Sequence, residues 1–384
     1  MLAWVDGAPL SPADAGRAAG NATLGRWFLG CLVAAFAAYL AGLWLLHRRG
    51  ARLGAVALVA AAIQLAPLAG PLLLSTDSWT YWEYGRIAAV EGGNPYRDEP
   101  REFPGNPAYP FAGAAWRDTT SVYGPLFTLA SEPIALAAGD SEDAAAWIYK
   151  ALAAGAMLAA TALAARRARE KALAAAFVGW NPLLAVHMAG GGHNDAWLAA
   201  LVLAAVVLAA AGRRQLAGVA WAAAIGVKWV PAVLLAMRAL EARGTRRRVG
   251  HAGFAAGAAA VSALAVWRYG LDWLGAFGPL ARNAGTETSY ALPHRLEQLG
   301  LAHDVAIGLA LSLLAVALAL LARQALRGRA RLGLTACVLL LGTPWLAAWY
   351  VAWAVPLAAA EEDRTAQLAA LGLCAYLLPQ AVPL

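Results

Sequence analysis

Residues 27–46 read WFLGCLVAAFAAYLAGLWLL, twenty consecutive residues without a charged side chain. A helix of about 20 apolar residues spans the hydrocarbon core of a bilayer. The rest of the chain has the same character, because 61% of its 384 residues are hydrophobic, only 14% are charged, and the mean hydropathy is +0.56. Soluble domains are about half apolar and about one quarter charged. The composition therefore predicts an integral membrane protein and excludes soluble enzyme folds.

Further apolar runs follow along the whole chain, each bounded by polar residues. They are residues 54–74, 144–165, 172–189, 195–211, 214–227, 229–241, 250–267, 305–322, 332–344, 346–360 and 366–383. Four of them are too short to cross a bilayer alone, and they form two adjacent pairs, joined near Lys228 and near Pro344. Irregular backbone at membrane depth has to be shielded from lipid. We therefore expect an all-α bundle of about 11–13 transmembrane or half-membrane helices, with broken helices lining a cavity.

Clusters of arginine and lysine mark one set of loops. They are Arg48, Arg49 and Arg52; Arg166, Arg167, Arg169 and Lys171; Arg213 and Arg214; Arg238, Arg243, Arg246, Arg247 and Arg248; and Arg323, Arg327, Arg329 and Arg331. Cytoplasmic loops carry an excess of such residues, so we expect these clusters on the cytoplasmic side. They share one side only if residues 125–139 lie flat against the outer leaflet. The cytoplasmic side then holds 19 of the 30 Lys and Arg but 5 of the 23 Asp and Glu.

The resulting prediction is a multi-pass protein of the plasma membrane, with an external tail over residues 1–26 and a single transmembrane domain over residues 27–384. Its two long external loops are residues 75–143, with the flat juxtamembrane helix 125–139, and residues 268–304. Elaborated loops on one face predict that the functional site lies there. The net charge of +7 belongs to the cytoplasmic loops, so we do not expect a nucleic-acid partner.

The first external loop opens with DSWTYWEYGR at residues 77–86. Asp77 stands at the membrane boundary among aromatic residues. Partial removal of water there would raise its basicity toward that of a general base for a sugar hydroxyl. The alternative is a solvated aspartate beside an ordinary aromatic belt.

A second constellation is GGGHND at residues 190–195. The glycines allow backbone to approach a ligand, and His193, Asn194 and Asp195 supply an imidazole, an amide and a carboxylate suited to sugar hydroxyls or a phosphate. A turn in which Asn194 and Asp195 cap the next helix is the other interpretation.

Cations supply candidates for binding a phosphate. Lys150 and Lys228 are the two lysines inside predicted spans, where ionisable residues usually have a function. Arg282, His294 and Arg295 of the second external loop could clamp a phosphate or an acceptor. Snorkelling of the lysines, most of all Lys150, and simple solvation of the loop are the alternatives.

Several classes of site are missing from the sequence. It contains neither a phosphate-binding loop of nucleotidases nor a dinucleotide-binding glycine fingerprint, so a nucleotide sugar is a poor donor candidate. Its aspartates and histidines are not spaced as a metal cage, and we expect neither a divalent metal nor another cofactor.

The motifs, taken in order, resemble the GT-C superfamily of multispanning glycosyltransferases that use polyprenyl-phosphate sugars. The resemblance is greatest to the actinobacterial alpha-mannosyltransferases of lipomannan and related glycolipid assembly. It covers most of the chain, although the span at residues 27–46 is additional and the chain is shorter than many relatives. The residues that carry it are Asp77, Tyr81 and Gly85; Gly93 to Tyr96; Trp116; Tyr123 to Leu126; Asn181 and Pro182; Gly191 to Asp195; Gly226 to Lys228; and Pro344 to Leu357.

The resemblance implies an external active site in which Asp77 is the catalytic base. The expected reaction is an inverting transfer of a hexose, first of all mannose, from a polyprenyl-phosphate sugar to a glycolipid or glycan acceptor. A flippase or exporter of such lipids, or a scaffold for envelope assembly, remains the alternative. We expect phosphate contacts from Lys228, His193, Arg282, His294, Arg295 and Lys150, and sugar or acceptor contacts from Asn194, Asp195, Tyr81, Glu83, Asn94, Tyr96, Tyr123 and Trp345.

Overall fold

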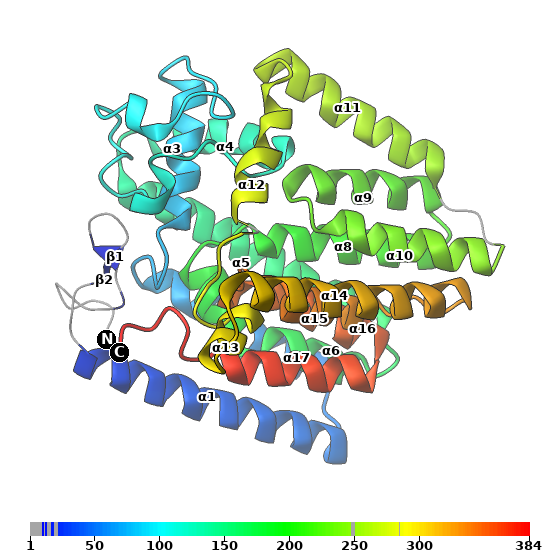
Figure 1. Cartoon of the computed structure of the whole chain (residues 1–384). Helices are drawn as coiled ribbons and strands as arrows, with labels where there is room; N and C mark the ends of the chain where they lie inside the picture. The colour runs from blue at the N-terminus through cyan, green and yellow to red at the C-terminus, as the bar shows by residue number, and fades with distance from the viewer. Residues whose placement is uncertain (1–9, 11, 14–16, 19–21, 247–249, 284) are drawn as a thin grey trace.

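The computed structural model describes residues 10, 12–13, 17–18, 22–246, 250–283 and 285–384, and nearly all of them belong to helices or short connections (Figure 1). Two strands of two residues each, β1 (Pro12–Ala13) and β2 (Arg17–Ala18), pair antiparallel near the N-terminus. The predicted all-α class is thus confirmed. The predicted tail over residues 1–26 lies mostly outside the described residues.

Among the residues that the structure describes, three helices are long and apolar enough to cross a membrane by length and composition. They are α1 (Ala22–Arg49), α5 (Glu142–Arg167) and α14 (His303–Leu326). Two bent pairs raise the number to five if each counts as one span: α6 (Lys171–Gly179) with α7 (Pro182–Ala185) and the π-helical turn η6 (Val186–Gly190), and α11 (His251–Tyr269) with η7 (Asp272–Ala276) and α12 (Phe277–Asn283). The pairs bend by 50° and 100°, respectively.

The remaining helices are shorter. They are α2 (Leu53–Leu65), η3 (Ala66–Ala69), α3 (Asp77–Ala89), η4 (Pro100–Glu102), η5 (Ala114–Trp116), α4 (Pro125–Ala138), α8 (Asp195–Ala210), α9 (Arg214–Val227), α10 (Pro231–Gly244), α13 (Leu292–Gln298), α15 (Leu332–Gly342), η8 (Ala348–Trp353), α16 (Val355–Glu361) and α17 (Arg364–Leu377).

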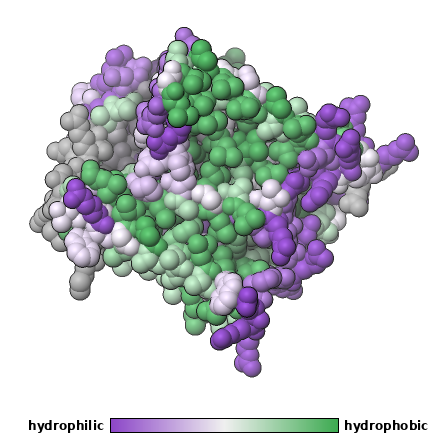
Figure 2. Space-filling model, turned by 60° about the horizontal axis from the view of Figure 1, so that its bottom comes forward, coloured by the Kyte–Doolittle hydropathy of each residue, from purple (hydrophilic) through white to green (hydrophobic). Residues whose placement is uncertain are grey.

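The long helices differ in what surrounds them. In the most apolar stretch of α5, 50% of the residues are buried, compared with 22% in α1 and 17% in α14. Hydrophobic side chains such as Trp44 and Val316 are therefore exposed on the outside of the bundle. Figure 2 shows such side chains over the middle of one face, with hydrophilic groups gathered at its right-hand edge. A broad apolar surface of this kind suits a lipid environment.

Local sequence explains how α5 begins and ends. The hydroxyl of Ser141 accepts a hydrogen bond from the N–H of Ala144, which caps the helix, and Glu142 and Asp143 follow in the first turn. Arg166 and Arg167 stand in the last turn. Acidic residues at the start and basic residues at the end both stabilise the helix dipole. In the predicted topology, the acidic residues of α5 lie on the external side and its basic residues on the cytoplasmic side.

The two breaks expected from the sequence are present. α9 ends at Val227, Lys228 is extended with φ −155° and ψ 147°, and Pro231 is the first residue of α10. The second break lies between Gly342 and Ala348, where α15 gives way to η8. The predicted flat segment also forms a helix, α4, which packs against α3.

Four of the predicted basic clusters lie together at one end of the bundle. The end of α5, the start of α9, the middle of α10 and the connection before α15 contribute Arg167, Arg214, Arg238 and Arg331 to the lining of one cavity. These loops therefore share a side of the molecule, as their charge predicted. We call this side the basic end and the opposite side, with α3 and α4, the loop end.

The segment predicted as the second external loop is more regular than expected. Residues 268–304 contain η7, α12 and α13 instead of an extended loop. Arg268 and the hydroxyl of Tyr269 both bind Glu132 of α4, at 2.9 and 2.6 Å. This partly buried contact ties the end of α11 to α4 and so holds residues 268–304 against the segment 75–143.

Candidate active site

The site at the loop end starts with Asp77, the first residue of α3. The Nδ1 atom of His193 lies 3.2 Å from the Oδ2 atom of Asp77, and the hydroxyl of Tyr81, one helical turn further on, lies 3.4 Å from the same oxygen. The His193 side chain is fully buried, and that of Asp77 is 15% exposed. The aspartate thus remains open to a ligand while its histidine partner is enclosed by protein.

Two glycines place His193 beside Asp77. Gly192 has φ +70°, which disfavours any residue with a side chain, and a Cβ atom there would lie 2.2 Å from the Ser78 hydroxyl oxygen. Ser78 follows Asp77 in α3 and donates a hydrogen bond of 2.9 Å to the carbonyl of Gly191. The glycine motif therefore docks directly on the start of α3.

The opposite side of His193 is covered by Trp349 of η8. The two rings are stacked, with centroids 4.0 Å apart and planes 12° apart. His187, on the π-helical turn η6, lies 5.8 Å from the same indole and 6.1 Å from His193, measured between ring centroids. Turns of this type inside helices are frequent at functional sites. Here the turn brings a second buried imidazole to the site.

Asp195 and Lys228 form the second charge pair of the site. The Nζ atom of Lys228 lies 2.8 Å from Oδ1 of Asp195, and the indole N–H of Trp353 donates to the same oxygen at 2.5 Å. The ammonium also lies over the rings of Tyr350 and Trp353, 4.7 and 5.5 Å from their centroids. Carboxylate and aromatic faces together make a favourable environment for a cation.

The Tyr-Gly-Pro motif positions this lysine. The N–H of Gly124 donates a hydrogen bond of 3.0 Å to the carbonyl of Val227. This carbonyl stands at the end of α9, where it has no partner within the helix. A Cβ atom at Gly124 would lie 2.3 Å from the carbonyl oxygen of Gly226, so only glycine allows this approach. The neighbouring Tyr123 packs edge-on against Tyr81, with ring centroids 5.0 Å apart.

The pKa of Asp77 shifts in the direction opposite to the one expected from the sequence. Burial raises the pKa of this carboxyl, but the interactions with His193 and with the Lys228 ammonium together outweigh burial. The pKa of Asp77 is consequently lowered from its ordinary value instead of raised. Asp77 is a carboxylate at neutral pH, ready to accept a proton.

Several buried polar atoms around this pair have no hydrogen-bond partner within the part of the chain that the structure describes. They include both ring nitrogens of His187, Nε2 of His193, the amide oxygen and nitrogen of Asn194, and Oδ2 of Asp195. Buried polar atoms are normally paired, so a concentration of unpaired ones indicates a place for water or a polar ligand. Donors and acceptors lie side by side here, which suits hydroxyl groups.

Lys150 has another environment. Its side chain is buried, and its ammonium donates to the carbonyls of Gly70 and Pro71, the latter at 3.0 Å. Neither the expected phosphate contact nor snorkelling describes this geometry. Lys150 instead supplies hydrogen bonds to irregular backbone just before α3.

Asn94 and Tyr96, expected at the sugar, connect the loops. The amide of Asn94 donates to the carbonyl of Tyr269 and to Asp272, both at 2.9 Å. The hydroxyl of Tyr96 is buried and donates to the carbonyl of Tyr123 at 3.0 Å. Both residues therefore hold backbone in place.

Glu83 is fully buried, and both of its carboxylate oxygens lack a hydrogen-bond partner among the described residues. Burial raises the pKa of Glu83 to about 8, although the charge of Arg117 partly opposes the shift. Arg117 is the charged group that acts on Glu83, whereas His193 and Lys228 act on Asp77. Trp345 contacts Trp116, with ring centroids 6.4 Å apart, and Trp116 packs with Gly113 beside Thr76.

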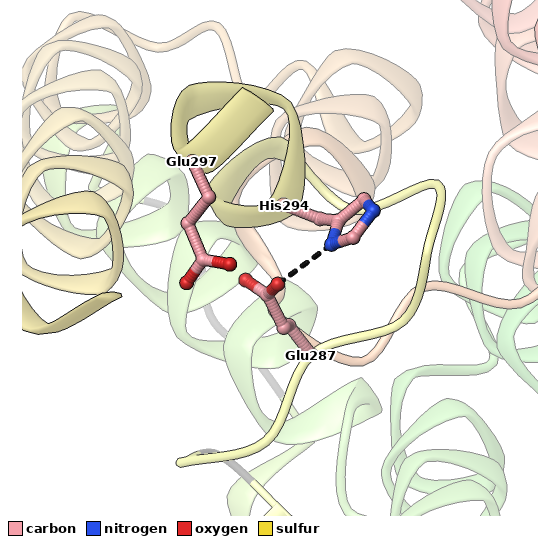
Figure 3. A group of neighbouring side chains, drawn as sticks. All are labelled: Glu287, His294 and Glu297. Carbon is pink, nitrogen blue, oxygen red and sulfur yellow. Dashed lines mark hydrogen bonds and ion pairs between the residues drawn. The ribbon is translucent and has the colours of Figure 1, made fainter. Parts of the chain in front are cut away.

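The three expected cations of the second loop engage protein groups or solvent. Arg282 is exposed at the end of α12, and Arg295 donates to the hydroxyl of Tyr376 at 2.7 Å. Figure 3 shows His294 directed at Glu287, with Nδ1 and Oε1 2.8 Å apart, and Glu297 beside them. These two carboxylates and the imidazole offer ligand atoms within 4.8 Å of one another and could hold a cation. However, His294 already pairs with Glu287, and His303 already pairs with Glu297.

Sequence reasoning missed the roles of His187 and Ser78. His187 lies in an apolar stretch without a recognisable motif, and only the π-helical turn directs it inward. The late aromatics Trp349, Tyr350 and Trp353 belong to the segment from Pro344 to Leu357 that carried the family resemblance. The structure puts them against His193 and Lys228.

The fold and the site together define an all-helical membrane protein with a buried polar site between broken helices and a long loop. A family model described as Alpha-(1->6)-mannopyranosyltransferase, N-terminal domain, matches residues 5–243. The chain belongs to this family, which confirms the resemblance to actinobacterial mannosyltransferases. The matched residues include Asp77, the His193–Asp195 motif and Lys228, but not the aromatics of η8.

Curated relatives carry the same activity in their names. The chain is 30% identical over 168 residues to alpha-(1->6)-mannopyranosyltransferase A of Corynebacterium glutamicum, which covers 42% of this chain and 34% of that protein. It is 31% identical over 152 residues to a probable alpha-(1->6)-mannopyranosyltransferase of Mycolicibacterium smegmatis, covering 38% and 27%. The alignments thus span about a third of each relative or less. No solved structure matches the chain.

Proposed function

We propose that this protein is a glycosyltransferase that moves mannose from a polyprenyl-phosphate sugar to a glycolipid or glycan acceptor. The observation that carries the proposal is the buried pair of Asp77 and His193 beside unpaired polar atoms and a second, cationic group, Lys228. A carboxylate base and a cation are the two charges that such a transfer needs. Family membership supports mannose as the sugar.

The proposed reaction is a single displacement with inversion. Asp77 takes the proton from the acceptor hydroxyl, whose oxygen forms a bond to the anomeric carbon as the bond from that carbon to the phosphate oxygen breaks. Both electrons of that bond leave with the polyprenyl phosphate. Lys228 stabilises the charge that grows on the phosphate, while His193 keeps Asp77 ionised and oriented.

The basic end is the cytoplasmic side in this proposal, so that Asp77 faces the exterior of the plasma membrane. The excess of arginine at that end supports this orientation. Single cysteines substituted at Asp118 of the loop end and at Arg327 of the basic end test it with a membrane-impermeant thiol reagent on intact cells. Labelling at position 118 alone is expected, and labelling at position 327 alone would reverse the orientation.

The decisive experiment measures label transfer from radiolabelled polyprenyl-phosphate mannose to membrane glycolipids. Wild type, Asp77→Asn and Asp118→Asn are compared as purified proteins in detergent. Asp118 is a matched control, because its side chain is 68% exposed and pairs only with Arg101 among the described residues. We expect Asp77→Asn to lose at least about 100-fold in turnover, the lower range for acid–base catalysis, and Asp118→Asn to keep it.

Turnover near wild type in Asp77→Asn would remove the role of Asp77 as base. If no variant transfers label to any acceptor, yet all bind the lipid and move it between leaflets of a vesicle, the protein is a flippase and the transferase proposal fails.

A further inference from the structure

A cavity lies at the basic end, on the side of the molecule opposite the loop end. Its volume is about 940 Å³, and it is enclosed by the ends of α5, α8, α9, α10 and α11 and by the segments flanking α15 and α16. Cavities that bind small molecules measure about 300–1,000 Å³. Neither Asp77 nor Lys228 lines it, so the transferase site does not account for it.

The lining has two chemically different parts. One wall consists of hydrophobic side chains, of which Val206 and Trp221 are buried and Leu235 and Phe254 half-buried. The mouth carries arginines with exposed side chains. They are Arg167, Arg169, Arg214 and Arg329, with Arg238 and Arg331 less exposed. An apolar wall below a charged mouth suits an amphiphilic ligand whose head group is anionic.

Ion pairs inside the cavity leave part of this positive charge uncompensated. Arg331 makes two hydrogen bonds to Asp363, at 2.5 and 2.7 Å, Arg169 lies 3.2 Å from Glu362, and Arg238 pairs with Glu241.

The fourth acid, Glu361, accepts hydrogen bonds from the backbone N–H groups of Leu332 and Gly333, both at 2.9 Å. Among the described residues, Arg167, Arg214 and Arg329 then have no acidic partner.

We propose that this cavity binds an anionic phospholipid of the adjacent leaflet. The phosphate of its head group takes the place of the missing carboxylates between Arg167, Arg214 and Arg329, since guanidinium groups bind phosphate oxygens in a fork. An acyl chain lies along the hydrophobic wall. A neutral sugar would leave the three arginines unpaired, and a soluble anion would leave the apolar wall facing water.

The test compares two triple variants with the same loss of charge at the same end. In the first, Arg167, Arg214 and Arg329 become Gln. In the control, Arg49, Arg52 and Arg323 become Gln; these arginines are exposed but do not line the cavity. All six side chains are exposed, so both variants should fold.

The measurement is the increase in unfolding temperature of delipidated protein in detergent on titration with short-chain phosphatidylglycerol. Phosphatidylcholine and inorganic phosphate are titrated in parallel. For wild type and the control variant we expect a saturable increase with phosphatidylglycerol only. For the cavity variant we expect an affinity at least tenfold lower. Ala209→Leu places a larger side chain in the cavity and leaves the arginines unchanged. It should also weaken phosphatidylglycerol binding.

Three results would overturn the proposal. Equal weakening in both triple variants would reduce the effect to general attraction between basic protein and acidic lipid. An equal response to inorganic phosphate would make the ligand a free anion. Full affinity in the cavity variant would exclude the arginines. Because no outcome depends on sugar transfer, this test is separate from that of the transferase.

Discussion

The ammonium of Lys228 lies 2.8 Å from the carboxylate of Asp195, which also accepts the indole N–H of Trp353. The positive charge of Lys228 is therefore balanced by the Asp195 carboxylate before any phosphate binds. Removing one partner of a buried pair leaves an unpaired charge and costs about 3–5 kcal/mol. A single substitution of Lys228 therefore mixes the loss of a ligand contact with the loss of stability.

A double variant separates these effects. Lys228→Gln and Asp195→Asn should each lower the unfolding temperature in detergent by roughly 5 °C or more, given the cost of an unpaired buried charge. The double variant should recover most of this loss. Affinity for the polyprenyl-phosphate donor should stay at least tenfold weaker in the double variant, because the cation is gone. Wild-type donor affinity in that variant would show that Lys228 does not bind the phosphate.

His193→Ala should change the pH dependence of turnover. The active form is the Asp77 carboxylate, which is lost as pH falls through its pKa in the folded protein. In wild type this pKa is lowered, because His193 and Lys228 outweigh burial. Without the imidazole, burial dominates, and the acidic limb of kcat/KM should move to higher pH by about one unit or more.

The matched control for this profile is His187→Ala, which removes a neighbouring imidazole that does not contact Asp77. Its acidic limb should stay in place even if turnover falls. A slower His193→Ala enzyme with an unmoved limb would mean that His193 acts on the ligand instead of on Asp77.

Gly192→Ala should damage the site through geometry. The new Cβ atom would lie 2.2 Å from the Ser78 hydroxyl oxygen, in a backbone conformation with φ +70°. We expect a loss of turnover of at least tenfold, since small displacements of catalytic groups have large effects. Adding Ser78→Ala removes the clashing oxygen and should restore part of the activity. A double variant no better than Gly192→Ala would place the damage elsewhere.

Glu83 should make stability depend on pH. Its pKa is about 8 in the folded protein, above the ordinary value of 4.5, so the folded state keeps a proton that the unfolded chain loses between these values. Stability therefore falls as pH rises from about 4.5 to 8, by at most about 1.4 kcal/mol per pH unit. Glu83→Gln cannot titrate, and its advantage in unfolding temperature should be larger at pH 8.5 than at pH 5.

The exposed Glu91 provides the control for this prediction. Glu91→Gln should differ from wild type equally at both pH values. An advantage of Glu83→Gln that does not change with pH would mean that Glu83 is ionised throughout.

Much of the fold could be predicted because lipid imposes simple rules. An uncharged run such as residues 27–46 has to be a helix, and a proline after Lys228 has to interrupt one. Four of the five arginine clusters also share one side of the molecule, as their charge predicted. The 100° bend between α11 and α12 was not foreseen, because the run around Gly270 carries no pattern that distinguishes a bend from a loop.

The site was predicted in part for similar reasons. Asp77, His193 and Lys228 belong to motifs with unusual polar residues in apolar surroundings, and such residues are visible in a sequence. Which group each one contacts is not visible. The pairing of Lys228 with Asp195 and the use of Asn94 as a bridge between loops depend on distances between segments far apart in the chain.

The contact of Lys150 with the carbonyls of Gly70 and Pro71 has a consequence for biosynthesis. A lysine inside a helix opposes insertion by the translocon, with a cost of about 3 kcal/mol at the bilayer centre. The carbonyls that bind the Lys150 ammonium belong to an earlier part of the chain and are synthesised first. The carbonyls that compensate the Lys150 ammonium are therefore already part of the chain when the helix that carries Lys150 is synthesised.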